Sequence, residues 1–261
     1  MSMNRPLIGV QVQPQHADYE SMRRTWAELD QLGADMLFNW DHFFPLNGDP
    51  DGLHFESLTL QAAMAEVTSR ARIGALVMCN SYRNPSYLAD ALRTVDHISG
   101  GRLIVGLGSG WFRRDYDEYG YEFGTAGSRL RALRRDLPIF KDRLAKLNPA
   151  PLGPMPLLIG GSGEKVTLRI VAEHADMWHG FGDLERYQSK YEVLASHCAS
   201  VGRDPGSITR VWAVQRGKLE AAEALHAAGV GVLTVGVSGP SYDLGQVREL
   251  LQWREGVTKG A

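Results

Sequence analysis

A fully apolar run that leads directly into a glycine-rich stretch is the feature that most constrains the fold of this chain. Residues 103–107 read Leu-Ile-Val-Gly-Leu, and the next three residues are Gly108, Ser109 and Gly110. Such a run has no polar alternation, which is typical of a parallel strand covered on both faces in an α/β protein. The glycines lack a Cβ atom, so a flat or anionic ligand can approach the backbone closely. The segment therefore predicts a parallel sheet with a ligand at its carboxyl edge.

Strand and helix patterns alternate from one end of the chain to the other. Eight strand–helix units in a chain of 261 residues match a (β/α)8 TIM barrel, in which helices surround a closed ring of parallel strands. An open doubly wound sheet with extra strands is the alternative. We predict one TIM-barrel domain over residues 1–261, with its active site on the loops that follow the strands. The expected strands are residues 7–12, 35–40, 73–78, 103–107, 157–159, 176–179, 208–214 and 230–235.

Composition and charge exclude several classes of function. The formal net charge of −2 gives no electrostatic attraction to nucleic acid or to a membrane surface. The two cysteines, Cys79 and Cys198, fall inside apolar segments, which suits a reducing compartment and gives no disulfide framework. The chain enters its first strand at Leu7 with no signal-peptide pattern, and no apolar run approaches the roughly 20 residues that span a bilayer. We expect a cytoplasmic protein with neither a nucleic-acid nor a membrane partner.

The loop after the second expected strand carries a candidate for proton chemistry. It begins with Asp41 and His42, and Phe43, Phe44 and Pro45 follow. A histidine beside a carboxylate can donate or accept a proton near neutral pH, because the reference pKa of histidine is about 6.5. The alternative is a histidine that only caps the strand end through a backbone carbonyl.

The loop after the third expected strand offers polar side chains for a ring-shaped ligand. Asn80 can hydrogen bond the carbonyl and amide edge of a heteroaromatic ring, or it can serve as a turn residue. Arg83 can neutralise an anion, or it can pair with a carboxylate on a helix. Asn84 and Pro85 then predict an N-cap and a first-turn proline at the start of the next helix.

A second glycine-rich loop, residues 160–163, lies between a strand and a helix. Backbone N–H groups at a helix N-terminus, together with the Ser162 hydroxyl, form a cradle for phosphate. The alternative is that these glycines only form an ordinary turn between the strand and the helix. The earlier glycine run lacks the dinucleotide fingerprint, because Trp111 stands where the third glycine belongs. The Cys and His residues show no metal-ligand spacing, so we predict no metal site.

Four motifs in a fixed order resemble those of the bacterial luciferase-like flavin and deazaflavin oxidoreductases. The resemblance covers residues 7–178 well and is nearest to the branch that uses coenzyme F420, a deazaflavin. It implies a TIM barrel, a homodimer and a ring of the isoalloxazine type lying across the barrel mouth. The motifs are Asp41-His42-Phe43, the run from Ser99 to Trp111, the run from Leu158 to Gly163, and the run from Ala175 to Trp178.

The resemblance also implies roles for individual residues. The histidine that handles a proton or orients the ring in the family matches His42, and we expect Asp41 to orient it. The family bulge at the third strand exit, often with a non-proline cis peptide, supports the ring from behind and matches residues 78–80. The family phosphate site matches residues 160–163. The residues expected to bind the cofactor are Met78, Cys79, Asn80, Ser109, Trp111, Gly160, Gly161, Ser162 and Gly163.

Two positions depart from the sugar-phosphate dehydrogenases of the family. Those enzymes carry Trp where this chain has Leu46, and an acidic residue where it has Trp111. Their general acid is therefore absent, which argues against a sugar-phosphate dehydrogenase. We expect an apolar substrate pocket that includes Phe44, Leu46 and His179.

Three functional hypotheses follow from these motifs. The first is an F420-dependent oxidoreductase that transfers a hydride between the deazaflavin ring and a small organic substrate. The second keeps the fold but binds FMN and acts as a monooxygenase. The third is a cofactor-binding protein without its own turnover. The substrate is a small molecule in the first two cases.

Overall fold

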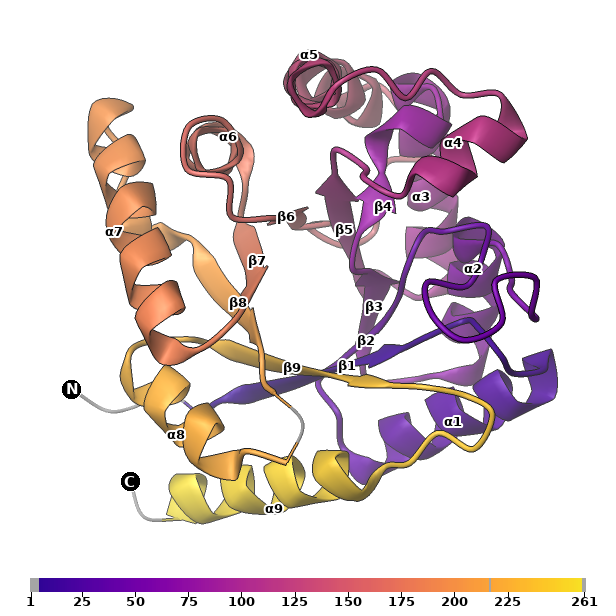
Figure 1. Cartoon of the computed structure of the whole chain (residues 1–261), viewed down its shortest axis with the longest axis vertical. Helices are drawn as coiled ribbons and strands as arrows, with labels where there is room; N and C mark the ends of the chain where they lie inside the picture. The colour runs from indigo at the N-terminus through magenta and orange to yellow at the C-terminus, as the bar shows by residue number, and fades with distance from the viewer. Residues whose placement is uncertain (1–4, 216, 260–261) are drawn as a thin grey trace.

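The computed structural model describes residues 5–215 and 217–259, and it shows a ring of parallel strands surrounded by helices (Figure 1). The strands are β1 (Leu7–Val12), β2 (Met36–Asn39), β3 (Arg72–Ala75), β4 (Met78–Cys79), β5 (Leu103–Gly108), β6 (Leu157–Gly160), β7 (Met177–Phe181), β8 (Thr209–Ala213) and β9 (Val232–Val237). They pair in the order β3-β2-β1-β9-β8-β7-β6-β5-β4, and a further pairing of β3 with β5 closes the ring. The predicted (β/α)8 TIM barrel is therefore confirmed, and the open sheet is excluded.

Apolar side chains cover both faces of the central strands. On β5, Ile104 packs inside the barrel, whereas Leu103 and Val105 pack in the layer between the strands and the helices. All three side chains are completely buried, which explains why this strand has no polar alternation. The barrel interior is filled by Met36, Phe38, Leu76, Ile104, Leu158, Met177, Val211 and Val232.

Helices surround the ring and are fixed mostly by local signals. Asn84 accepts hydrogen bonds from the first amides of the third helix, and Pro85 occupies its first turn, as predicted. Gly33 ends the first helix in the left-handed conformation with φ of 97°. The helices are α1 (Tyr19–Leu32), α2 (Ser57–Val67), α3 (Pro85–Ile98), α4 (Arg113–Tyr119), α5 (Ala126–Ala145), α6 (Thr167–His174), α7 (Leu184–Ser200), α8 (Leu219–Ala227) and α9 (Gly245–Lys259); short 3₁₀ turns are η1 (Asn80–Tyr82) and η2 (Pro205–Ser207).

The third barrel strand is interrupted, although the sequence predicts a continuous strand over residues 73–78. The strand breaks between β3 and β4, and the peptide bond between Leu76 and Val77 is cis. The break therefore precedes the segment 78–80 to which the resemblance assigned it. Gly108 and Gly160 on the neighbouring strands accommodate the displaced Val77 side chain, since a Cβ on either would lie 2.6 and 2.9 Å from its methyl carbons. A bulge of this kind commonly redirects side chains next to a functional site.

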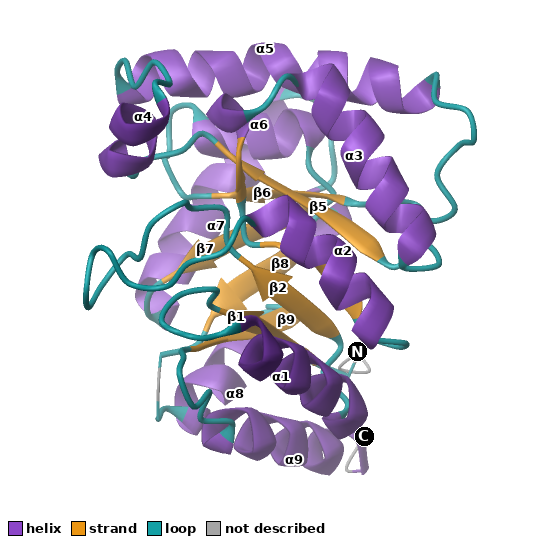
Figure 2. Cartoon of the chain, turned by 90° about the vertical axis from the view of Figure 1, so that its right-hand side faces the viewer, coloured by secondary structure: helices purple, strands orange, loops and turns teal. Residues whose placement is uncertain are grey.

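Two helices differ from the sequence expectation. From the sequence we expect a long loop after Trp111, but that segment contains the helix α4, whose residues are charged or aromatic. We also expect the helix after the glycine loop to begin at Glu164, but α6 begins at Thr167, so the connection is three residues longer. Figure 2 shows α4 and the loop between β2 and α2 on the same side of the barrel.

Candidate functional site

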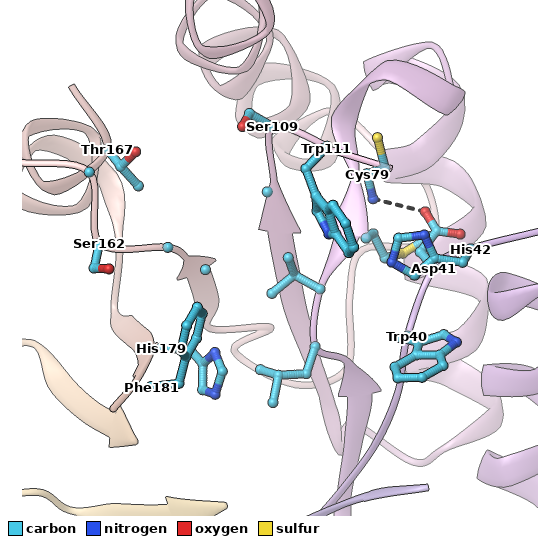
Figure 3. A pocket seen from close by; sticks show the side chains of 18 of the residues that line it. Trp40, Asp41, His42, Cys79, Ser109, Trp111, Ser162, Thr167, His179 and Phe181 are labelled. Carbon is cyan, nitrogen blue, oxygen red and sulfur yellow. Dashed lines mark hydrogen bonds between the residues drawn. The ribbon is translucent and has the colours of Figure 1, made fainter. Parts of the chain in front are cut away.

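A cavity of about 420 Å³ opens at the carboxyl ends of the strands. Its walls come from the ends of β2, β4, β5, β6 and β7, which is where active sites of TIM barrels lie. Figure 3 shows the glycine loop with Ser162 and Thr167 on one side, and His42 and Trp111 on the other. The lining residues are Trp40, Asp41, His42, Leu46, Leu76, Val77, Met78, Cys79, Tyr82, Gly108, Ser109, Gly110, Trp111, Gly160, Gly161, Ser162, Gly163, Thr167, His179 and Phe181.

His42 and Asp115 form a hydrogen-bonded pair at the cavity wall. The distance from His42 Nδ1 to Asp115 Oδ2 is 2.7 Å, and the Asp115 side chain is completely buried. A carboxylate only accepts hydrogen bonds, so Nδ1 carries a proton and donates it. Nε2 is therefore the nitrogen of this ring that can exchange a proton with a ligand in the cavity. The pair has the geometry of a general acid or base held by an orienting carboxylate.

Two further donors fix the Asp115 carboxylate. The Phe43 backbone N–H donates to Oδ1 at 3.0 Å, and the Tyr82 hydroxyl donates to Oδ2 at 2.8 Å. Burial raises the pKa of Tyr82, and the neighbouring Cys79 and Asp115 raise it further, so the phenol keeps its proton and remains a donor. The carboxylate is thereby held in one orientation, and so is the imidazole of His42.

Asp41 does not orient His42, which corrects the sequence expectation. Its Oδ2 accepts the Cys79 backbone N–H at 2.8 Å, and Arg83 donates to both of its oxygens at 2.7 and 2.9 Å. Arg83 also pairs with Glu56. Burial opposes the charge on Arg83, but the carboxylates of Asp41 and Glu56 raise its pKa, so it stays charged. This ion cluster, in which Asp41 and Arg83 are buried and Glu56 is partly exposed, connects the β2 exit to the β4 exit.

Aromatic rings surround His42. Trp40, Trp111 and Phe112 meet its ring edge-on, with centroids 5.9, 5.7 and 5.5 Å away. Trp40 Nε1 donates to His54 Nε2 at 3.0 Å. Because an indole N–H can only donate, His54 Nε2 is unprotonated. Burial lowers the pKa of His54 to about 4, and nearby His42 lowers it as well, which agrees with this neutral form.

The glycine loop and the start of α6 form the opposite wall. Gly161 has φ of 117°, and a Cβ at Gly163 would lie 2.9 Å from Thr167 Oγ1. The N-cap residue of α6, Val166, supplies no side-chain acceptor for the first-turn amides. The Leu168 N–H of the first turn donates to the Gly163 carbonyl oxygen, which holds the loop on the helix start. The loop and the hydroxyls of Ser162 and Thr167 line the cavity at a helix N-terminus, a place that suits an anion.

Two other titratable groups in the cavity are neutral near pH 7. Burial lowers the pKa of His179 to about 4. Burial also raises the pKa of the Cys79 thiol to about 11, and its sulfur lies 3.2 Å from the Tyr116 hydroxyl oxygen. A protonated, buried thiol is a poor nucleophile.

The cavity brings together most of the predicted site residues, with two exceptions. Asn80 was expected to contact the cofactor ring, but its amide donates to Asp136 on α5 at 2.8 Å, and it lines a separate polar depression. Phe44 was expected in the substrate pocket, but its ring packs on the guanidinium of Arg114, with the guanidinium carbon 4.0 Å from the ring centroid. The residues that line the cavity as expected are Asp41, His42, Leu46, Met78, Cys79, Ser109, Trp111, Gly160, Gly161, Ser162, Gly163 and His179.

Sequence reasoning missed several residues of the site. Asp115 lies 73 residues after His42, in the helix α4 that the sequence did not predict. Trp40 follows β2, Phe181 ends β7 and Thr167 begins α6, so their position at the carboxyl ends of the strands was the signal that could have identified them.

Two searches of the described parts of the chain gave negative results. Among residues 5–215 and 217–259, no group of three or more His, Cys, Asp or Glu side chains is arranged to hold a metal ion. None of the helices in those ranges has the length and apolar character that crossing a membrane requires.

Comparison with known proteins finds a matching family and relatives with similar sequences. The model of the luciferase-like monooxygenase family matches residues 6–230. An uncharacterized protein of Mycobacterium tuberculosis is 31% identical over 181 residues, which is 61% of this chain and 64% of that protein. An F420-dependent glucose-6-phosphate dehydrogenase of Amycolatopsis mediterranei is 28% identical over 155 residues, which is 52% of this chain and 46% of that enzyme. The matches thus span less than two thirds of either relative.

Solved structures share the fold. The coenzyme F420 dependent tetrahydromethanopterin reductase of Methanopyrus kandleri superimposes with a TM-score of 0.72 at 14% identity, over 95% of this chain and 97% of that one. A type II Baeyer-Villiger monooxygenase of Pseudomonas putida in complex with FMN gives a TM-score of 0.61 at 14% identity, over 81% and 67% of the two chains. At such identities the likeness concerns the fold alone.

Proposed function

The chain belongs to the luciferase-like monooxygenase family, and from this premise we propose that it is an oxidoreductase that uses coenzyme F420. Relatives in this family are oxidoreductases or monooxygenases, which supports an enzyme. The observation that carries the proposal is the His42–Asp115 pair, which faces a glycine cradle across one cavity. A proton-handling histidine and an anion cradle in the same cavity suit a phosphate-bearing redox cofactor.

The residues of the cavity fit such a cofactor. A Cβ at Gly161 or Gly163 would press against Thr167, so glycine lets the loop lie close to the start of α6. These residues line the cavity, and the phosphate is expected beside them. Val77 and Leu76 form an apolar floor between the cradle and His42, and a planar ring is expected against them. When bound, a deazaflavin supplies a site that accepts or donates a hydride.

Residues of the chain supply the rest of the chemistry. His42 Nε2 gives a proton to the substrate or takes one from it, while Nδ1 stays bonded to Asp115. Trp40 and Trp111 pack edge-on against the imidazole and hold it in place. Met78, Cys79 and Ser109 line the wall near the floor and are expected to contact the ring.

An FMN-dependent monooxygenase is the second candidate, because the same cradle also suits FMN. The Pseudomonas putida structure with FMN shows that this fold accommodates a flavin. The Asp41-His42-Phe43 motif and the relative whose name specifies F420 favour the deazaflavin for this chain.

Calorimetric titration of the purified protein with F420, and separately with FMN, tests the proposal. Tight binding of F420 alone supports it, whereas tight binding of FMN alone would replace it with the monooxygenase. If neither F420 nor FMN binds, residues 160–163 do not form the phosphate cradle that we assign to them. Turnover with a hydride donor or acceptor, abolished by His42→Ala, distinguishes an enzyme from a protein that only binds the cofactor.

We further propose that the protein is a homodimer in the cytoplasm and acts on a small molecule without nucleic-acid or membrane partners. This proposal rests on the family resemblance and on the net charge of −2. Sedimentation analysis tests the dimer, and a mass of 28.8 kDa would contradict it, because that is the mass of one chain.

A further inference from the structure

Apolar side chains line the cavity on both sides of its opening. Trp40 and Leu46 follow β2, Trp111 follows β5, and Phe181 ends β7. Trp111 is 62% exposed and Phe181 is 56% exposed, although both line the cavity. Figure 3 shows them on opposite sides of the opening. Large exposed rings at a cavity mouth are typical of a binding surface for apolar ligands.

Cationic side chains are missing from these walls. Among the described residues that line the cavity, none is Lys or Arg. The guanidinium of Arg83 lies behind the wall and is bonded to Asp41 and Glu56. Arg114 is bonded to Asp51 and the Pro50 carbonyl oxygen.

Two more arginines near the cavity are not among the residues that line it. Arg129 donates to the carbonyl oxygens of Gly110 and Phe123. Arg186 lies over the Phe181 ring at 5.4 Å and lines a separate surface depression. An anionic group in the cavity would therefore meet no Lys or Arg among the described lining residues.

The fixed charges around His42 are mainly negative. The carboxylates of Asp41 and Glu56 share one guanidinium, that of Arg83, and the carboxylate of Asp115 bonds to His42 itself. His179 adds no positive charge, because burial lowers its pKa to about 4. A desolvated anion without a partner is strongly disfavoured, and these carboxylates disfavour it further.

A cationic ligand finds no free carboxylate there either. Asp115 is fully buried and already accepts from His42, Phe43 and Tyr82. Asp41 is almost as buried and already accepts from Cys79 and Arg83. An ammonium group in the cavity would lose water without gaining a direct ion pair.

We propose that the substrate of this site is uncharged and largely apolar, and that the rings of Trp111 and Phe181 bind it. The inference rests on the proposed oxidoreductase function and restricts its substrate class. It excludes phosphorylated sugars and carboxylates as substrates, because their charge has no partner outside the glycine cradle.

Three probes of matched size test the inference by binding rather than by turnover. Benzamide is neutral, benzoate is anionic and benzylamine is cationic near neutral pH. Their affinities are measured by calorimetry in phosphate buffer, so that inorganic phosphate occupies the glycine cradle. We expect benzamide to bind about tenfold more tightly than either charged probe. Equal or tighter binding of benzoate or benzylamine would overturn the inference.

Variants of the wall connect the preference to these residues. Phe181→Ala, at an exposed position, is expected to weaken benzamide binding about tenfold, which corresponds to about 1.4 kcal/mol. Leu46→Arg is expected to reverse the preference in favour of benzoate. Tyr87→Ala is the matched control, because Tyr87 is a 61% exposed ring on α3 outside the cavity. A variant at Phe181 that binds benzamide as well as the Tyr87 variant would contradict the proposal.

Cofactor titration separates this inference from the function on which it rests. Failure of both F420 and FMN to bind would refute the proposed oxidoreductase, while the probe preference is still measured on the same protein. Conversely, tight F420 binding together with a preference for benzoate would support the oxidoreductase but refute an uncharged, apolar substrate. The probe series is then repeated on the protein loaded with the cofactor that binds.

Discussion

At the scale of single residues, Asp115 connects the loop after β2 to the 3₁₀ turn η1. It accepts one backbone N–H, one phenol and one imidazole N–H, all from residues more than 30 positions away in the chain. Buried hydrogen bonds to a charged group are stronger than neutral ones, so the carboxylate fixes the tautomer and direction of His42.

Replacing Asp115 with Asn tests this role. The Asn side chain has the same shape, but its NH₂ group is a donor and stands where the carboxylate accepts two hydrogen bonds. The His42 imidazole therefore loses its fixed tautomer. We expect single-turnover rates to fall about 10²–10⁴-fold while cofactor affinity stays constant. Stopped-flow absorbance of the bound cofactor measures the rate. Asp117→Asn on the same helix, at an exposed residue paired with Arg113, should leave it unchanged.

Gly110 is a second residue whose identity the tertiary structure dictates. Its φ is 77°, and a Cβ there would overlap the Tyr116 hydroxyl and lie 2.5 Å from Cys79 Sγ. We expect Gly110→Ala to lower the free energy of unfolding by about 2–4 kcal/mol, from backbone strain and overpacking together. Urea denaturation measures this loss.

The control for Gly110 is Gly120, which ends α4 with φ of 70°. Nothing lies within 4 Å of a Cβ there, so Gly120→Ala adds strain without a clash. We expect it to cost about 1 kcal/mol. Equal losses of unfolding free energy in the two variants would contradict this prediction, because they would mean that Tyr116 and Cys79 move aside at no energetic cost.

At the scale of elements, the ion cluster of Arg83, Asp41 and Glu56 joins three parts of the barrel mouth. Asp41 follows β2, Glu56 is the N-cap of α2, and Arg83 ends η1. The Cys79 N–H at the end of β4 completes the set of donors to Asp41. The cluster thereby fixes the loop that carries His42.

Arg83→Met tests the contribution of this cluster to stability. It removes the cation but leaves Asp41 buried, and an uncompensated buried charge costs about 3–5 kcal/mol. Urea denaturation should show a loss of that size. The exposed Arg23, which pairs with Glu20 three residues earlier, provides the control, and Arg23→Met should not shift the denaturation midpoint measurably. A comparable shift in both would refute a special role for the cluster.

At the scale of the whole molecule, two neutral histidines make stability depend on pH. Burial lowers the pKa of His54 and of His179 from 6.5 to about 4. Between about pH 4 and about pH 6.5, these two histidines bind more protons in the unfolded chain than in the folded protein. Stability is therefore greatest above about pH 6.5 and falls as the pH decreases toward 4.

His54→Gln tests this dependence, since Gln also accepts the Trp40 N–H but does not titrate. The free energy of unfolding is measured with urea at about pH 7 and about pH 5. Its decrease between these two pH values should be about 1–2 kcal/mol smaller in the variant than in the wild type. His97→Gln, at a half-buried residue on α3 whose ring bonds to the Ala150 carbonyl oxygen, is the control. An identical pH dependence in wild type and His54→Gln would contradict the lowered pKa.

The sequence by itself determined the architecture and the edge at which the site lies. Two-face burial of residues 103–107, the N-cap at Asn84 and the glycine loop at 160–163 are local patterns, and each appears in the structure where it was predicted. Local patterns are readable because backbone preference and burial periodicity depend on neighbours within a few positions.

Only the tertiary structure decided which side chains pair. His42 bonds to Asp115 rather than to the adjacent Asp41, Arg83 binds Asp41, and Asn80 turns toward α5. These partners lie 42 to 73 residues apart, and closure of the barrel brings them together. Sequence adjacency favoured Asp41 as the partner of His42, but the hydrogen-bond partner is selected by which loops meet at the barrel mouth. That selection depends on strand register and on the helix α4, and neither leaves a local signal.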